Sequence, residues 1–312
     1  MDLSIVTTLY NSSSYIDDFY RRIRKAAEGV ATDIEIIFVN DGSPDYSLDV
    51  AKSIYEKENG IKIIDLSRNF GQHKAMMVGL AHATGKRIFL IDCDLEEDPE
   101  LLNLFYQEMD KTCADAIYGV QEMRAGGILK RVSGNLFYGL FNLFSSYPVP
   151  SNPTNTRLMT QRYVKSLLQH QEREFYLAGL WAMTGYAQEP LKIKKHYKGH
   201  STYTLGRKLT ILVNAITSFS NQPLNFIFYL GSVIVTLSTT AAFVLIIRRI
   251  FLHELLAGWS SLIVSIWLLG GLTIFTVGIL GIYLSKVFIE TKHRPYAIIR
   301  SIYDKQGPIK ID

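Results

Sequence analysis

Two long stretches without a charged residue stand out in the pattern of hydrophobic and polar positions along the 312-residue chain. They run from Leu224 to Ile247 and from Leu255 to Ser285, with a short linker between them. At a rise of about 1.5 Å per residue, a helix of either length can cross a hydrocarbon layer of about 30 Å. The pattern therefore predicts a transmembrane hairpin over residues 223–285, with helices at about 224–247 and 260–284. The alternative is a pair of buried core helices, but charge-free runs this long are rare in soluble proteins.

Basic residues flank the two predicted helices unequally. Six lysines and arginines lie in residues 191–223 and six in 286–312, whereas the linker holds only Arg248 and Arg249. Cytoplasmic flanks of membrane helices are enriched in such residues, so both long ends are expected in the cytoplasm. The predicted order of parts is a cytoplasmic domain over 1–205, an interfacial helix over 206–222, the transmembrane hairpin over 223–285 and a cytoplasmic tail over 286–312.

The first hundred residues alternate between two patterns. Apolar, β-branched runs predict strands, and stretches with helical spacing lie between them. The predicted strands are Leu3–Leu9, Ile34–Val39, Ile61–Leu66 and Arg87–Ile91, and the predicted helices include Tyr15–Glu28 and His73–Ala83. Such a series predicts a Rossmann-like α/β domain with a mainly parallel sheet, in which ligands bind where the strands end.

Charge and cysteine content exclude two functional classes. The formal net charge is +4, from 33 basic and 29 acidic residues, and no dense run of lysine and arginine indicates a nucleic acid partner. The two cysteines, Cys93 and Cys113, form neither a metal-binding nor a redox pair, which fits a reducing compartment.

Polar residues follow each predicted strand, and the pair of Asp92 and Asp94 is the most informative. Two carboxylates at positions i and i+2 after a buried strand repel each other unless a cation lies between them. Hard oxygen ligands suit Mg²⁺ or Mn²⁺, which commonly bridges one or two carboxylates and substrate phosphates. Capping of the next helix is the alternative role, but Asp98-Pro99-Glu100 is available for that purpose. The sequence therefore predicts a metal site at Asp92 and Asp94.

The polar segments occur in an order that resembles a known family. They are Tyr10-Asn11, Asp41-Gly42-Ser43, Ser67-Arg68-Asn69-Phe70-Gly71, Asp92-Cys93-Asp94-Leu95 and Asp98-Pro99-Glu100. In order and spacing they resemble the family 2 glycosyltransferases with the GT-A fold. The resemblance is closest to the polyprenyl-phosphate glycosyltransferases, the bacterial branch similar to dolichol-phosphate-mannose synthase. It covers nearly the whole chain, and membrane-anchored members of that branch carry two C-terminal transmembrane helices.

The resemblance implies a role for each matching residue. The donor-binding residues would be Tyr10, Asn11, Asp41, Arg68 and Asp92, with Asp41 at the nucleoside and Arg68 near the diphosphate. A structural role for Arg68 in its loop is an equal alternative. The metal, Mg²⁺ or Mn²⁺, would be held by Asp92 and Asp94.

Catalysis is assigned by the same resemblance to Asp94, Arg157 and Asn155. Arg157 matches the arginine of the family's Gly-Asp-Phe-Arg motif and would face the reaction centre or the acceptor phosphate. The aspartate of that motif is Asn155 here. An alcohol acceptor needs a general base, whereas a phosphate monoester with a second pKa of about 6 is already ionised at neutral pH. Asn155 can orient a ligand by hydrogen bonds, so the change favours a phosphate acceptor.

Other positions also depart from the family pattern. They are Thr8 and Ser12 on either side of the Tyr-Asn pair, and His196, His200 and Thr202 in the late Arg-x-x-Gly-Glu-Ser-Lys-Tyr motif. These changes leave the sugar donor open.

A stripe of apolar residues at helical spacing over 128–144 has three cations near its start, Arg124, Lys130 and Arg131. An amphipathic helix of this kind suits the bilayer interface, where the cations are candidates for binding the acceptor phosphate. An ordinary core helix with solvated cations explains the pattern equally well. A second stripe, within 206–222, ends at Pro223 just before the first predicted span, which favours an interfacial helix.

The resemblance therefore implies a membrane-anchored inverting glycosyltransferase of the bacterial inner membrane. It would move a sugar from a UDP- or GDP-sugar to polyprenyl (undecaprenyl) phosphate at the cytoplasmic face, for envelope glycan or O-antigen biosynthesis. One alternative is transfer to a hydroxyl group of a lipid-linked oligosaccharide. Another is a non-catalytic donor-binding membrane scaffold, which the changes at Asn155, His196, His200 and Thr202 would fit. The family suggests a homo-oligomer, and the glycines of the second span permit one.

Overall fold

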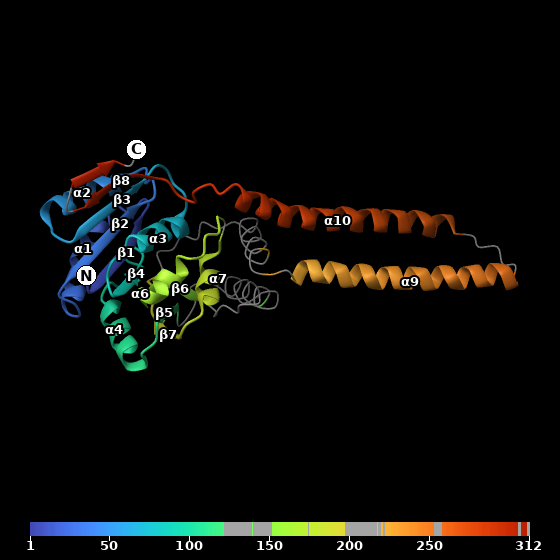
Figure 1. The fold of residues 1–312 in the computed structure, drawn as a ribbon, viewed down its shortest axis with the longest axis horizontal. Coiled ribbons are helices and arrows are strands. Elements are labelled where there is room, and N and C mark those ends of the chain that lie inside the picture. The colour runs from blue at the N-terminus through green and yellow to red at the C-terminus, as the bar shows by residue number, and fades with distance from the viewer. Residues whose placement is uncertain are drawn as a thin grey trace.

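The computed structural model describes residues 1–121, 139, 152–173, 175–196, 217, 220, 222–252, 258–304 and 307–310. In this part of the chain the strands form a nine-stranded sheet in the order β7-β5-β6-β4-β1-β2-β3-β8-β9. Figure 1 shows the sheet and its covering helices at one end of the molecule, and two long helices, α9 and α10, that extend away from it side by side.

The middle of the sheet consists of four parallel strands that follow the predicted alternation. β1 is Leu3–Leu9, β2 is Ile34–Asn40, β3 is Ile61–Leu66 and β4 is Arg87–Leu90. Every residue of β1 and β2 is buried, as expected for strands that are covered by helices on both faces. The predicted strands are confirmed, and because the four run parallel their carboxyl ends meet at one edge.

Helices cover both faces of this sheet. One face carries α1 (Ile16–Glu28), α2 (Ser47–Lys57) and α4 (Leu101–Thr112), and the other carries α3 (Gln72–Ala81), α6 (Gln161–Leu167) and α7 (Leu177–Thr184). On the first face Phe19 and Phe105 pack with Ile5 of β1, and on the second Met76 packs with Val6. Successive side chains of β1 thus point to opposite faces of the sheet and pack into two separate hydrophobic cores.

The sheet is mixed, which corrects the expectation of a mainly parallel one. β6 (Pro153–Thr160) lies between β4 and β5 (Ala116–Gln121) and runs antiparallel to both, while β7 (Gln188–Ile193) pairs parallel with β5. The insertion of β6 between two earlier strands depends on long-range backbone pairing. A local hydrophobic pattern does not record such pairing.

The chain that follows α10 returns to the sheet, although the sequence pattern predicts only a tail over 286–312. β8 (Ile299–Asp304) pairs antiparallel with β3, and β9 (Gly307–Lys310) pairs with β8. These strands are short and half polar, so their periodicity is weak. They supply hydrogen-bond partners to the edge of β3, which would otherwise present unpaired backbone groups.

The two long helices are α9 (Gln222–Leu252) and α10 (Trp259–Thr291). In the described ranges one stretch, Ser265–Thr291, is long and apolar enough to cross a membrane, whereas the apolar part of α9, Gln222–Ser238, is shorter. The predicted hairpin of two transmembrane helices is therefore not confirmed. Apolar side chains on α10 point outward, and Trp267 is 79% exposed.

Several predicted features lie outside the described residues. They are the cations Arg124, Lys130 and Arg131, the stripe over 128–144 except residue 139, the segment 206–222 except residues 217, 220 and 222, and the positions of His200 and Thr202.

Candidate active site

The loops that follow β1 and β2 are joined at the carboxyl edge of the sheet. The backbone N–H of Asn11 donates a hydrogen bond of 2.8 Å to Ser43 Oγ, and that of Ser12 donates one of 3.0 Å to Ser47 Oγ. Asn11 has a left-handed backbone (φ 53°), which asparagine tolerates better than most residues. Tyr10 and Asn11, predicted to bind the donor, therefore lie beside the loop that carries Asp41.

Asp41 joins the loop after β2 to the loop after β3. It is 2% exposed, and its two carboxylate oxygens accept hydrogen bonds from the backbone N–H groups of Phe70, at 2.7 Å, and Gly71, at 3.0 Å. Burial raises the pKa of Asp41, although these two hydrogen bonds lower it. In this structure Asp41 orders the loop that carries Arg68, and a direct contact with the nucleoside stays a prediction.

The same two loops touch at Gly42. Its φ is +58°, and an added Cβ atom would lie 2.4 Å from the carbonyl carbon of Arg68 and the backbone nitrogen of Asn69. Only glycine suits this position, because it combines a left-handed backbone with direct contact between two main chains. The Arg68 guanidinium is exposed and stacks over the Phe70 ring, 4.3 Å from its centroid.

Asp92 receives hydrogen bonds from two different elements. Its Oδ1 accepts one of 2.9 Å from Gln72 Nε2 at the start of α3, and its Oδ2 accepts one of 3.1 Å from Asn155 Nδ2 on β6. Burial, followed by the nearby charge of Asp94, raises the pKa of Asp92 to about 6. The structure thus brings together Asp92, Asp94 and Asn155, three of the residues that the sequence assigns to the site.

Asp94 and Asp92 are the candidate metal ligands. In the described part of the chain no group of three or more His, Cys, Asp or Glu side chains is arranged to hold a metal ion. Two neighbouring carboxylates nevertheless fit Mg²⁺ or Mn²⁺, which takes its remaining ligands from water and substrate phosphates. The raised pKa of Asp92 agrees with this fit, because a divalent cation would offset the repulsion from Asp94.

A second acidic pair, Glu96 and Glu97, lies next to these aspartates and was not singled out in the sequence. Lys195, just after β7, places its Nζ 3.0 Å from Glu96 Oε2 and 3.7 Å from Glu97 Oε1. Glu97 is 1% exposed, and burial together with the charge of Asp92 raises its pKa to about 7. The sequence signal for this pair was the density of acidic residues between Asp92 and Glu100. Such a cluster requires a cation nearby, which predicts a basic partner such as Lys195.

The residues assigned to helix capping have another role. Glu100 occupies the N-cap position of α4, but its side chain makes no capping hydrogen bond there. Asp98 and Glu100 instead form ion pairs of 2.8 Å and 2.6 Å with Arg22 of α1. Asp98 Oδ2 also lies 3.1 Å from Nε2 of His196, one of the positions that depart from the family pattern. These contacts attach the acidic loop to α1 and to the segment after β7.

Arg157 lies inside the domain, underneath α7. It is 3% exposed, and its guanidinium carbon is 3.3 Å from the centroid of the Trp181 ring and 5.5 Å from that of Tyr118. Within the described residues Nε and Nη1 of Arg157 have no hydrogen-bond partner. Burial lowers its pKa to about 10. Contact between Arg157 and the acceptor phosphate stays a prediction.

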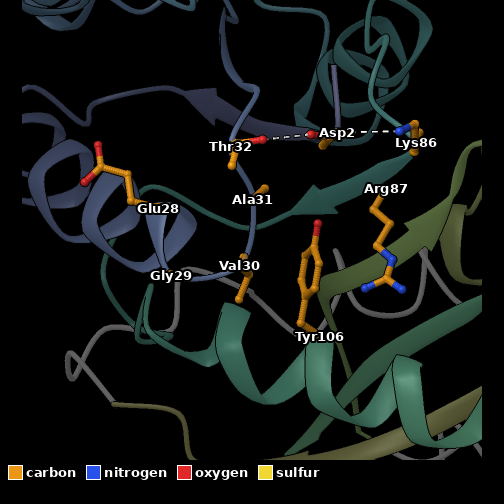
Figure 2. A pocket seen from close by; sticks show the side chains of 9 residues that line it. All are labelled: Asp2, Glu28, Gly29, Val30, Ala31, Thr32, Lys86, Arg87 and Tyr106. Carbon is orange, nitrogen blue, oxygen red and sulfur yellow. Dashed lines mark hydrogen bonds and ion pairs between the residues drawn. The ribbon is translucent and has the colours of Figure 1, made fainter.

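A cavity of about 440 Å³ lies at the opposite edge of the sheet, where the strands begin (Figure 2). Its charged groups already have partners: Asp2 binds Lys86 at 2.9 Å, and Arg87 pairs with Asp110. Arg87 also stacks over Tyr106, 4.5 Å from the ring centroid. The raised pKa values and the dense carboxylates lie at the other edge, which is therefore the candidate active site.

The chain is similar to several known proteins along most of its length. Residues 4–172 match the profile of "Glycosyl transferase family 2". A protein of Mycobacterium tuberculosis that is named "Putative glycosyltransferases" is 55% identical over 97% of this chain and 89% of its own length. The "Prophage bactoprenol glucosyl transferase homolog" of Escherichia coli is 29% identical over 97% of this chain and 99% of its own. The "Bactoprenol glucosyl transferase" of Shigella phage SfV is 29% identical over 96% and 99%, respectively.

Proposed function

The chain belongs to glycosyl transferase family 2, and from that premise we propose that it transfers a sugar from a UDP- or GDP-sugar to polyprenyl phosphate, with inversion, at the inner membrane. The mixed α/β sheet is the GT-A-like fold of this family, and the enzyme class is that of a nucleotide-sugar glycosyltransferase.

The observation that carries the proposal is the environment of Asp92. Its carboxylate is held by Gln72 and Asn155 and lies close to Asp94, and its pKa is raised to about 6. A half-buried pair of acids at the carboxyl ends of parallel strands suits a divalent cation that is shared with a diphosphate. When bound, Mg²⁺ or Mn²⁺ at Asp92 and Asp94 would supply charge compensation for the departing diphosphate.

The donor would occupy the loops around Asp41. Tyr10 and Asn11 would contact the nucleotide from the loop after β1, and Arg68 would lie near the diphosphate. The ordering of the Phe70 and Gly71 backbone by Asp41 supports this assignment, since a fixed loop presents its groups to a ligand at low entropic cost.

The amide at Asn155 supports a phosphate acceptor. A sugar hydroxyl requires a general base, but Asn155 donates a hydrogen bond to Asp92 and cannot take a proton. Glu97 has a pKa of about 7, yet it is 1% exposed and is engaged by Thr156 Oγ1. An ionised phosphate oxygen would attack the anomeric carbon in line as the bond to the diphosphate breaks, and Arg157 would compensate its charge. Relatives named bactoprenol glucosyl transferases agree with a polyprenyl acceptor.

The membrane arrangement proposed here is a hairpin, with helices at about 224–247 and 260–284 and both chain ends in the cytoplasm. Ser265–Thr291 has the length and composition of a span, and α9 lies beside it. Tyr283 near the end of α10 donates a hydrogen bond of 2.7 Å to the Ser220 carbonyl just before α9. This contact agrees with the entry and exit of the hairpin being on the same side.

The acceptor lipid would reach the catalytic domain along the membrane surface. An interfacial helix over 206–222 and the cations Arg124, Lys130 and Arg131 would receive the lipid phosphate beside the domain over 1–205. The lipid-linked sugar would serve envelope glycan or O-antigen biosynthesis. In the described residues a Cβ atom added at Gly278 or Gly281 of α10 meets nothing within 4 Å, which leaves room for a second copy in a homo-oligomer.

The test is synthesis of a glycolipid by the purified full-length protein. Either undecaprenyl phosphate or a lipid-linked oligosaccharide is incubated with it, together with Mn²⁺ or Mg²⁺ and a panel of UDP- and GDP-sugars, and butanol-extractable product is measured. We expect product with one donor and a loss of about 10²-fold in Asp94→Ala. The matched control is Asp110→Ala, which removes a carboxylate that is 62% exposed on α4 and keeps activity.

Two results would contradict the proposal. Product formed only on the hydroxyl group of a lipid-linked oligosaccharide would favour the first alternative acceptor. No product with any donor, or full activity in Asp94→Ala, would favour the non-catalytic scaffold.

A further inference from the structure

The segment that leaves the membrane helix α10 reaches the donor edge of the sheet. α10 ends at Thr291, and β8 begins at Ile299 beside β3 (Figure 1). The backbone N–H of Ser67, the first residue of the loop after β3, donates a hydrogen bond of 2.9 Å to the carbonyl of Ile298. The loop that carries Arg68 is therefore bound directly to the chain that emerges from the membrane helix.

Arg300 is the residue at which the pairing of β8 with β3 is irregular. Asp65 pairs with Ser301 and Leu66 with Ile299, so Arg300 is the extra residue of a β-bulge. A bulge redirects its side chain, and bulges occur often beside active sites. Here Arg300 Nη2 donates a hydrogen bond of 2.6 Å to the Ser67 carbonyl, and Nη1 lies 3.5 Å from Asp65 Oδ2.

An ion pair followed by hydrogen bonds connects this guanidinium with three strand ends. Asp65 is 3% exposed, and its Oδ1 accepts a bond of 2.7 Å from Asn40 Nδ2. Asn40 Oδ1 in turn accepts one of 3.3 Å from the backbone N–H of Ser43, and Ser43 Oγ accepts one of 2.8 Å from that of Asn11. The loops after β3, β2 and β1 are thus linked in one chain of contacts that begins at Arg300.

We propose that Arg300 is a positioning residue for the nucleotide-sugar donor, and that the strand after the membrane helix completes the donor site. The inference rests on the proposed function, because these loops are the ones assigned to the nucleotide. Arg300 acts through the Ser67 carbonyl and the Asp65 carboxylate. A merely structural role for Arg300 would lower the thermal midpoint and leave donor binding unchanged. The Arg300 side chain is 58% exposed, and Asp65, which is 3% exposed, keeps its hydrogen bond from Asn40 when Arg300 is replaced.

The test compares Arg300→Met and Arg300→Lys with Arg21→Met in the full-length protein. Arg21 is 78% exposed on α1 and pairs only locally with Asp18, so its removal makes the same chemical change away from the site. The readouts are the donor KM, the acceptor KM, kcat, the dissociation constant for UDP or GDP with Mn²⁺, and the thermal midpoint. We expect the donor KM and the nucleotide dissociation constant to rise about tenfold in Arg300→Met.

The acceptor KM, kcat and the thermal midpoint should stay close to wild type in the same variant. Arg300→Lys keeps the charge and should recover part of the donor affinity, which a loss of folding would not do. A donor KM that is unchanged relative to Arg21→Met overturns the inference, and so does a lowered thermal midpoint without a donor effect. Failure of the wild-type protein to bind either nucleotide would instead overturn the proposed function, and this inference with it.

Discussion

The side-chain amide of Asn155 donates a hydrogen bond of 3.1 Å to Oδ2 of Asp92 and so joins β6 to the loop after β4. The two residues are 63 positions apart. Asn155 stands where the resembling family has an aspartate. An ionised carboxylate at this position would repel Asp92 and could not donate a hydrogen bond to it. Burial raises the pKa of Asp92, and the hydrogen bond from the Asn155 amide lowers it.

Asn155→Asp should destabilise the metal-free protein. At pH 7.5 the new carboxylate repels Asp92 and removes its donor, at a cost of about 1–3 kcal/mol. We expect a lower thermal midpoint, with partial recovery on addition of Mn²⁺, which would neutralise the added charge. The control is Asn59→Asp at an exposed turn. Equal midpoints for the two variants would contradict the arrangement described here.

Glu97→Gln should change the pH dependence of stability. In the unfolded chain the pKa of a glutamate is near its ordinary value of 4.5, and in the folded protein burial raises that of Glu97 to about 7. Between these values the folded state holds more protons, so stability falls as pH rises from about 4.5 to 7 and stays low above 7. Asp92, with a pKa raised to about 6, acts in the same direction.

The measurement is the thermal midpoint of the metal-free protein between pH 5 and 8. Over this range the ionisation of Glu97 should lower the free energy of unfolding of wild type by up to about 3 kcal/mol, and the thermal midpoint should fall with it. In Glu97→Gln the thermal midpoint should depend less on pH and should be higher than that of wild type at pH 8. Glu28→Gln, an exposed position on α1, should follow wild type. A curve for Glu97→Gln that parallels wild type would show that Glu97 ionises normally.

Arg157→Met tests the role of the buried guanidinium. Met fills similar space beside Trp181 without a charge, so the thermal midpoint should be unchanged or higher, since a buried cation with unpaired N–H groups is costly. If Arg157 compensates the acceptor phosphate, glycolipid synthesis should fall about 10²-fold. Arg162→Met removes a guanidinium that is 69% exposed and should keep activity. Full activity in Arg157→Met would assign the residue to packing alone.

Cysteine labelling tests the hairpin. The chain has two cysteines, of which Cys93 is buried and Cys113 is exposed. In intact cells a membrane-impermeant maleimide should label Gly258→Cys at the start of α10 in a Cys113→Ser background. Cys113 itself, and Thr291→Cys at the far end of α10, should react only after lysis. Labelling of Gly258→Cys only after lysis would rule out the two-span arrangement.

Local sequence was sufficient for the central strands and for the acidic pair. The apolar runs of β1 to β4 are covered on both faces, so their hydrophobicity alone marks them. Asp92 and Asp94 follow the last of these runs directly, and the family motif assigned Asn155 to the same site. These features depend on neighbours in the chain or on a motif that the residues themselves carry.

Local sequence patterns did not predict which cations lie beside the site. Lys195 reaches Glu96 and Glu97 only because β7 joins β5, and Arg300 reaches Ser67 only because β8 pairs with β3. Neither cation stands in a distinctive local context. The raised pKa of Glu97 likewise arises from burial, which depends on everything packed around it.

The sequence by itself determined that an α/β domain with acids at its strand ends is followed by two apolar stretches, because strand alternation and charge-free length are local properties. Only the tertiary structure decided that the sheet is mixed, that the segment after α10 is its edge, and that Arg157 is buried over Trp181. These depend on pairing and burial between separate segments of the chain. The free energy of such a contact depends on both segments at once, so the pattern of hydrophobic and polar residues within one segment does not predict it.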